Sequence, residues 1–232
     1  MVFKLVYGNH PFAHSIHDTM QLIQYGMSDI GHQVDFEKNI TRGKVNLIIE
    51  NFNYDFLHRY LDAAKFPGTS FILIGTEYVT GNTFNSFEKN SVDDLMFDSH
   101  YSNDEYWKKR FITFFEASEI ASSIWHLNEH AISDFQNKIS KDKVHYLPHC
   151  FLEGLYRKPT FKNNKDIDIL FTGTLTSFRK KFLRGLSSDN LIVKFLPTDT
   201  PPHIRQSFAR RSKISLNLKQ YIDWKYPSNS RY

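Results

Sequence analysis

The feature that most constrains the fold of this sequence is its regular alternation between short apolar runs and longer segments of helical periodicity. In the first 150 residues, the apolar runs predict β-strands at 2–7, 34–36, 45–49, 71–74, 120–127 and 144–147. Helical spacing of apolar residues predicts helices at 16–30, 52–64, 104–117 and 128–139. Strands that alternate with helices favour a mostly parallel sheet with helices on both faces.

Polar and turn-forming residues mark the ends of several of these segments. The sequence Ser15-Ile16-His17-Asp18 resembles a capping box and predicts the start of the first helix, and Gly31 predicts its end. Asn128 is predicted to cap the helix that follows it. Residues 79–103 are rich in Asn, Asp and Ser and are predicted to form a long loop.

A second strand–helix series begins after a change in composition at 151–166, which is rich in Gly, Pro, Asn and Lys and is predicted to be a linker. Strands are expected at 167–171, 191–195 and 214–218, and helices at 179–186 and 201–211. The prediction is therefore an α/β protein with two Rossmann-like doubly wound domains, 1–150 and 167–232. The second domain is expected to be incomplete, because it has about three strands where a typical sheet has about five to six.

The composition is that of an ordinary soluble protein, with one exception. The chain has no apolar run of the roughly 18 residues that a membrane helix needs, no signal-peptide pattern at its start, and one cysteine, Cys150. These features predict a cytoplasmic protein in a reducing compartment.

Aromatic residues make up 16% of the chain, which is the exception in its composition. That excess favours a core filled with Phe over surfaces that stack on bases or sugars, and both interpretations stay open.

Charge is distributed unevenly along the chain. Residues 1–140 carry 11 Lys and Arg against 18 Asp and Glu, whereas residues 141–232 carry 18 against 7. The basic second half is expected to face an anionic partner: a phosphorylated ligand, a membrane surface or a nucleic acid. Two solvated surfaces of opposite sign are the alternative.

Two stretches of the second half have the residue types of a phosphate site. The first runs from 168 to 181, where Gly173 lets the backbone approach a ligand and Arg179 and Lys180 open the following helix. The second is Pro227-Ser228-Asn229-Ser230-Arg231, in which Ser228 is expected to cap a new helix and Arg231 adds positive charge.

Together these motifs resemble the GT-B glycosyltransferases of the "glycosyl transferases group 1" type, which have a Phe-x-Gly strand loop and a later Pro-Ser-x-x-Arg segment. The resemblance implies that the donor diphosphate is bound by Gly173, Arg179, Lys180, Ser228, Ser230 and Arg231. The family's segment continues into a helix with a ribose-binding glutamate, but this chain ends at Tyr232. The resemblance therefore implies a C-terminally truncated member.

The first domain would then be the acceptor side. His10 and His14 follow the first strand, and Glu77 follows the strand at 71–74, so these three residues are the catalytic candidates. His126 and His130 are four residues apart, but no Glu follows His126, so no metal site is predicted. No cofactor is expected.

The leading functional hypothesis is transfer of a sugar from a nucleotide-diphosphate sugar to a hydroxyl of a glycan or lipid-linked acceptor, as in cell-surface glycan synthesis. The alternative is a catalytically inactive truncated relative that binds a sugar or nucleotide or serves as an interaction module. A nucleic-acid binder is disfavoured, because the sequence has no known recognition motif and its basic residues are scattered. Peripheral contact with the anionic inner face of the membrane remains open. So does a homo-oligomer formed through an unpaired edge strand near 214–218.

The absence of three motifs disfavours several enzyme classes. The sequence has no Gly-x-x-x-x-Gly-Lys-Ser/Thr loop, no Gly-x-Gly-x-x-Gly fingerprint and no Gly-x-Ser-x-Gly elbow. P-loop enzymes, dinucleotide oxidoreductases and serine hydrolases are therefore disfavoured.

Overall fold

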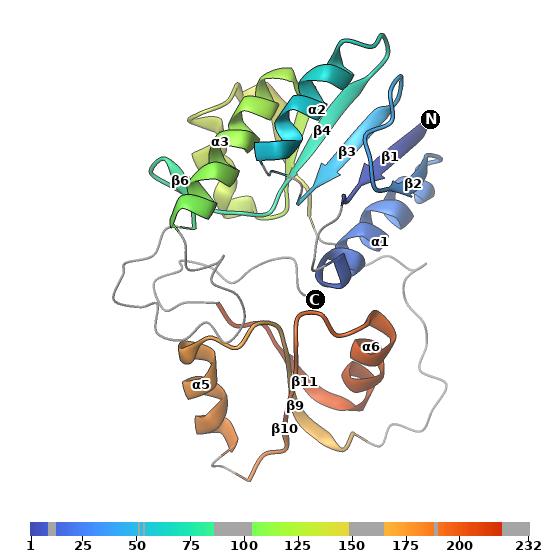
Figure 1. Cartoon of the computed structure of the whole chain (residues 1–232). Helices are drawn as coiled ribbons and strands as arrows, with labels where there is room; N and C mark the ends of the chain where they lie inside the picture. The colour runs from blue at the N-terminus through green and yellow to red at the C-terminus, as the bar shows by residue number, and fades with distance from the viewer. Residues whose placement is uncertain are drawn as a thin grey trace. The chain divides into compact units, whose positions relative to one another are not determined.

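The predicted apolar runs form two parallel sheets in two compact units, with β1–β8 in the first unit and β9–β11 in the second (Figure 1). This computed structural model describes residues 1–8, 13–50, 52, 54–85, 104–148, 165–187 and 190–219. The side chains of residues 13, 14, 54 and 55 are not described. The chain is thus an α/β protein whose sheets are compatible with Rossmann-like folds.

The first unit is built on a six-stranded sheet in the order β2-β1-β3-β4-β7-β8, with every pairing parallel. Its strands are β1 (Val2–Val6), β2 (Gln33–Glu37), β3 (Val45–Ile49), β4 (Ser70–Gly75), β7 (Ser123–His126) and β8 (Val144–Tyr146). The central strands β3 and β4 are buried along nearly their whole length, as strands covered on both faces must be. The strand order reverses between β1 and β3, which is where open α/β sheets bind ligands.

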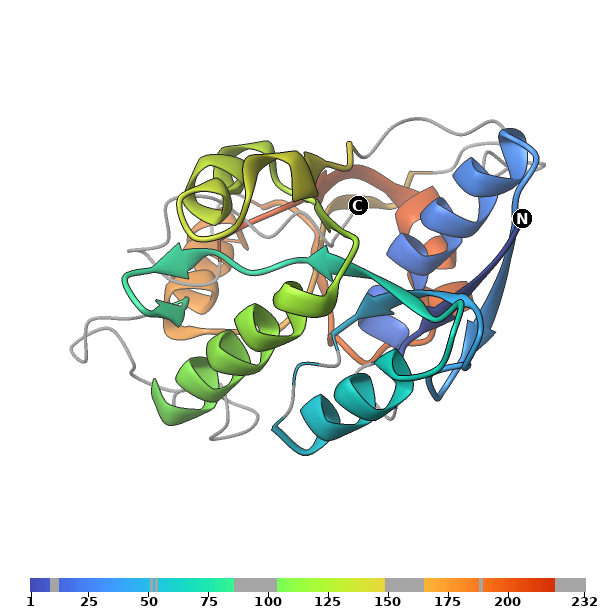
Figure 2. The same ribbon diagram turned by 90° about the horizontal axis from the view of Figure 1, so that it is seen from above.

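Helices cover both faces of this sheet, with α1 (Ala13–Asp29) on one face and α2 (Tyr54–Ala64) and α3 (Asp104–Ile120) on the other (Figure 2). Ile16, Met20 and Ile23 form the buried side of α1, as their spacing predicts. The helix ends before Gly31, whose φ of 81° favours a residue without a side chain.

Two expectations for α1 are wrong. The helix already begins at Ala13, so Ser15 lies inside its first turn and does not cap it. Ile30, expected on the buried face, lies beyond the end of the helix and is 68% exposed.

The cap predicted at Asn128 is confirmed. Its side-chain oxygen accepts from the backbone N–H of His130 at 2.9 Å. Asn128 starts a short helical segment, η2 (Glu129–Ala131) and α4 (Ile132–Gln136), which η3 (Lys141–Lys143) follows.

Phenylalanine fills much of the first unit's core. Phe84, Phe114 and Phe135 are at most 1% exposed, and their ring centroids lie 5.5–6.2 Å apart, a spacing typical of favourable aromatic pairs. Phe52 joins them with its centroid 4.6 Å from that of Phe114. The interpretation of the aromatic excess as core is confirmed in this part of the chain.

The polar stretch after β4 contains a hairpin that the loop prediction for 79–103 missed. β5 (Val79–Thr80) and β6 (Thr83–Phe84) pair antiparallel, with Val79 opposite Phe84. Gly81 opens the two-residue turn at a φ of 60°. The backbone N–H of Tyr78 donates to the side chain of Asn85, and the N–H of Asn85 donates to the carbonyl of Tyr78, so the base of the hairpin is closed on both sides.

The second unit has a three-stranded parallel sheet in the order β10-β9-β11. Its elements are β9 (Ile167–Thr172), α5 (Ser177–Ser187), β10 (Val193–Leu196), α6 (Pro202–Arg211) and β11 (Ser212–Leu216), with α5 and α6 on opposite faces (Figure 1). Among the described residues β11 pairs only with β9, so the predicted edge strand is confirmed there. No helix within the described ranges is long and apolar enough to cross a membrane.

Candidate functional site

The carboxyl edge of the first sheet holds a buried group of charges, here called the carboxylate–arginine cluster (Glu50, Glu77 and Arg110). Glu50 directly follows β3, Glu77 lies two residues beyond β4, and Arg110 comes from α3. One nitrogen of Arg110, Nη2, lies 2.7 Å from Glu50 Oε2 and 3.2 Å from Glu77 Oε1. All three side chains are largely buried: Arg110 is 3% exposed, Glu50 11% and Glu77 18%.

The sequence of α3 explains why a charged arginine lies so deep. Trp107, Arg110, Phe111 and Phe114 recur at helical spacing and are all buried, so Arg110 belongs to the apolar face of the helix. The rings of Tyr106 and Trp107 lie 5.6 and 5.9 Å from its guanidinium carbon. Because a buried charge is costly unless it is paired, the two glutamates that meet Arg110 offset the cost of burying it.

Further contacts fix the orientation of both carboxylates. Asn85, at the base of the β5–β6 hairpin, donates from Nδ2 to Glu77 Oε2 at 2.5 Å. The Thr76 hydroxyl donates to Glu50 Oε1. The carboxylate–arginine cluster is therefore held by β3, β4, the hairpin and α3 together, and its geometry is preorganised.

His126, at the end of β7, supports the backbone of Glu77. Its Nδ1 accepts from the backbone N–H of Asn128 at 3.0 Å, so Nε2 carries the proton and donates to the Glu77 carbonyl at 3.0 Å. A Cβ atom at Gly75 would lie 2.4 Å from the ring, so glycine is needed there. Both ring nitrogens are engaged, which gives His126 a structural role and leaves no ring nitrogen for a metal ion.

Burial and neighbouring charges shift the acid–base behaviour of this edge. Burial, and then the negative charge of Glu50, raise the pKa of Glu77 to about 7. Burial lowers the pKa of His126 to about 4, so the imidazole is neutral near pH 7. A carboxyl group that is half protonated at neutral pH is suited to accept or release a proton.

The second unit has its own candidate at the turn after β9. Gly173 has a φ of 145°, which other residues rarely adopt, and its N–H donates to the carbonyl of Leu196 at 2.9 Å. Thr176 caps α5 by accepting from the N–H of Arg179 at 3.4 Å. The Thr174 and Thr198 hydroxyls lie 3.0 Å apart. Amides and hydroxyls therefore gather at the carboxyl ends of β9 and β10.

Arg179 and Lys180, which the sequence treats alike, lie in different environments. Arg179 is 1% exposed and donates to the carbonyls of Thr174 at 2.8 Å, of Lys219 at 3.1 Å, and of Leu218. It therefore ties the turn after β9 to the segment after β11. Lys180 is only partly buried.

The remaining predicted site residues are not tested by this structure. His10, Ser228, Ser230 and Arg231 lie outside the described residues, as does the side chain of His14. Their roles stay predictions. Glu77, Gly173, Arg179 and Lys180 are described, and their surroundings are those given above.

Three members of the first unit's site were not predicted: Glu50, Asn85 and Arg110. Glu50 follows the apolar run at 45–49 much as Glu77 follows the run at 71–74. This similarity of position could have identified Glu50 as a second carboxylate at the ends of the strands. Alternation around Gly81-Asn82 was a hairpin signal that would have drawn attention to Asn85. Arg110, a charge within an aromatic helix face, was only weakly indicated.

Comparison of the sequence with protein-family models and with curated proteins gives no match.

Proposed function

We propose that this protein is a glycosyltransferase of the GT-B type that moves a sugar from a nucleotide-diphosphate sugar to a hydroxyl acceptor. The observation that carries the proposal is the turn after β9. There a glycine at a φ of 145° precedes a threonine-capped helix with Lys180 in its first turns. Backbone amides at a helix start, hydroxyls and a lysine are groups that bind phosphate oxygens in α/β proteins.

The chemistry follows from these groups. As the acceptor oxygen bonds to the sugar's anomeric carbon, the bond from that carbon to the diphosphate breaks and its electron pair leaves with the diphosphate. Amides of the turn and the ammonium of Lys180 would stabilise the negative charge that develops on the leaving group. Glu77, with its pKa raised to about 7, is the proposed acceptor of the hydroxyl proton.

A matched pair of lysine variants tests the donor site. Lys180→Ala should weaken binding of a nucleoside diphosphate by about 1–3 kcal/mol, the usual effect of losing a charged hydrogen bond. Lys181→Ala, an exposed lysine of the same helix, is the control and should leave the affinity unchanged. Titration calorimetry on the whole chain measures both. Equal affinities in the two variants would place diphosphate binding elsewhere.

Arg179 is a poor test residue for this purpose. Since its guanidinium holds three backbone carbonyls, Arg179→Ala should disturb the turn itself, and lost binding would not identify a ligand contact.

A non-catalytic sugar- or nucleotide-binding module is the second candidate. It is favoured by Arg179, whose guanidinium is engaged with the protein backbone and so contributes less to a diphosphate leaving group. Turnover separates the two functions. The transferase releases nucleoside diphosphate from a nucleotide-sugar when an acceptor is present, and Glu77→Gln slows that release. The binding module holds the nucleotide-sugar without releasing it.

A further inference from the structure

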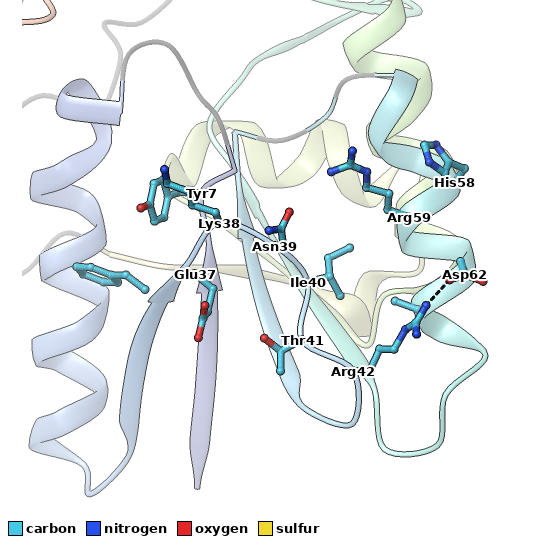
Figure 3. A pocket seen from close by; sticks show the side chains of 12 residues that line it. Tyr7, Glu37, Lys38, Asn39, Ile40, Thr41, Arg42, His58, Arg59 and Asp62 are labelled. Atoms are coloured by element: carbon cyan, nitrogen blue, oxygen red, sulfur yellow. Dashed lines mark hydrogen bonds and ion pairs between the residues drawn. The ribbon is translucent and has the colours of Figure 1, made fainter.

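The first unit contains a cavity of about 810 Å³ between α2 and residues 38–42, beside the carboxyl ends of β1 and β2 (Figure 3). Its volume is that of a small-molecule site. The polar residues that line it include Tyr7, Lys38, Asn39, Arg42, His58 and Arg59. None of them belongs to the carboxylate–arginine cluster or to the turn after β9.

The cavity exists because of an unusual connection. β2 and β3 are parallel and flank β1, and such a crossover usually contains a helix that covers the sheet. Here residues 38–44 make the connection as an irregular loop. A narrow loop covers less of the sheet than a helix would, so space remains between the loop and α2.

Hydrogen bonds fix the loop wall of the cavity. Asn46 is fully buried at the start of β3, where its Oδ1 accepts from the Thr41 N–H at 2.8 Å and its Nδ2 donates to the Thr41 carbonyl at 2.9 Å. The N–H of Gly43 donates to the Thr69 hydroxyl at 2.8 Å. These contacts hold the loop in place without a ligand, so the cavity is preformed.

Within the described residues, two of the cations that line the cavity have no carboxylate partner. Arg42 pairs with Asp62 at 2.7 Å, and Glu37 pairs with Lys4 at 3.1 Å. In the same part of the chain no carboxylate lies within 4.0 Å of the charged nitrogens of Lys38 or Arg59. Arg59 reaches from α2 toward the loop at Asn39, and Lys38 lies at the strand ends beside Tyr7 (Figure 3).

We propose that this cavity binds a phosphate-bearing small molecule, with Lys38 and Arg59 holding the phosphate and with Tyr7 and Asn39 contacting hydroxyls of an attached sugar. The planar guanidinium of Arg59 offers paired N–H donors to a phosphate, and the lysine adds a second positive charge. The phenol and amide groups match the hydroxyls of a carbohydrate in both donor and acceptor capacity. The residues of this site are different from those of the diphosphate turn in the second unit. The proposal can therefore be tested independently of the proposed function.

Titration calorimetry with a hexose 6-phosphate, inorganic phosphate and the uncharged hexose tests the proposal on the whole chain. The hexose phosphate should bind most tightly, inorganic phosphate more weakly, and the uncharged sugar not measurably. Lys38→Ala and Arg59→Ala should each weaken hexose phosphate binding about tenfold, within the range for a lost charged hydrogen bond. Lys44→Ala removes an exposed lysine of the same loop outside the cavity lining and should leave binding unchanged.

Two further measurements distinguish this cavity from the diphosphate turn of the second unit and from a lipid-binding surface. Lys38→Ala and Arg59→Ala should keep the wild-type affinity for a nucleoside diphosphate, because that ligand is assigned to the second unit. Sedimentation with phosphatidylcholine vesicles, with and without phosphatidic acid, tests whether the two cations instead recognise lipid phosphate.

Three outcomes would overturn the proposal. The first is equal hexose phosphate affinity in the Lys38, Arg59 and Lys44 variants, and the second is no binding of either phosphate. The third is lipid binding that needs Lys38 and Arg59 while hexose phosphate does not bind.

Discussion

At the scale of single residues, Glu77 is where opposing influences meet. Burial and the charge of Glu50 favour its protonated form, whereas Arg110 and the amide of Asn85 favour the carboxylate. The net result is a pKa of about 7, above the value of 4.5 for an ordinary glutamate. The free energy of unfolding therefore depends on whether Glu77 is protonated.

The pH dependence of stability follows with a definite sign. Between pH 4.5 and 7 the folded protein binds more protons at Glu77 than the unfolded chain does, so this contribution is fully present below pH 4.5 and is lost as pH rises through 7. The free energy of unfolding of wild type minus that of Glu77→Gln should fall by about 2–3 kcal/mol from pH 5 to pH 8.

Urea unfolding at several pH values measures this difference directly, and the comparison cancels the opposite trend expected from His126. Glu116→Gln, which removes an exposed carboxylate from the helix that carries Arg110, is the control. A difference between wild type and Glu77→Gln that stays constant across this range would show that Glu77 titrates normally.

At the scale of elements, two glycines near the junction of β9 and α5 differ in whether the backbone requires glycine. Gly173 ends the strand at a φ of 145°, and Gly185 lies within α5, where an added Cβ would meet no atom within 4 Å. The first position needs glycine for its backbone conformation. The second gains nothing from it.

Substitution of the two glycines by alanine should therefore have opposite effects. Gly173→Ala should destabilise the second unit by about 1–3 kcal/mol, the cost of a strained backbone. Gly185→Ala should stabilise it by about 0.5–1 kcal/mol, because alanine is the better helix former and loses less entropy on folding. Thermal unfolding followed by circular dichroism compares them. Two shifts of the same sign would contradict the backbone geometry of this junction.

At the scale of the whole molecule, the chain has two separate hydrophobic cores. Leu47, on β3, is fully buried in the first sheet, and Leu170, on β9, is 2% exposed in the second. Each sheet has its own reversal of strand order. Most of the basic half of the sequence belongs to the second unit.

Separate cores should give separable unfolding transitions in scanning calorimetry of the whole chain. Leu47→Ala and Leu170→Ala should each cost about 2–5 kcal/mol, the range for a leucine removed from a packed core. We expect each to lower the midpoint of one transition only, and a different one. A single transition that both variants lower equally would mean that the two units unfold as one.

The order of strands and helices can be predicted from the amino-acid sequence, because apolar periodicity is a local property that survives in the fold. The expected strands at 45–49 and 71–74 and the Asn128 cap hold within a residue or two. The hairpin at Gly81 could also have been predicted from the local alternation of residues around the turn.

Which side chains meet depends instead on how the chain packs in three dimensions. Arg110 is 60 residues from Glu50 and 33 from Glu77, and no local pattern joins them. The buried role of Arg179 depends on carbonyls 39 and 40 residues away. The cavity at Lys38 depends on β1 lying between β2 and β3. Such features arise from strand order and long-range packing, which a single sequence read along the chain does not contain.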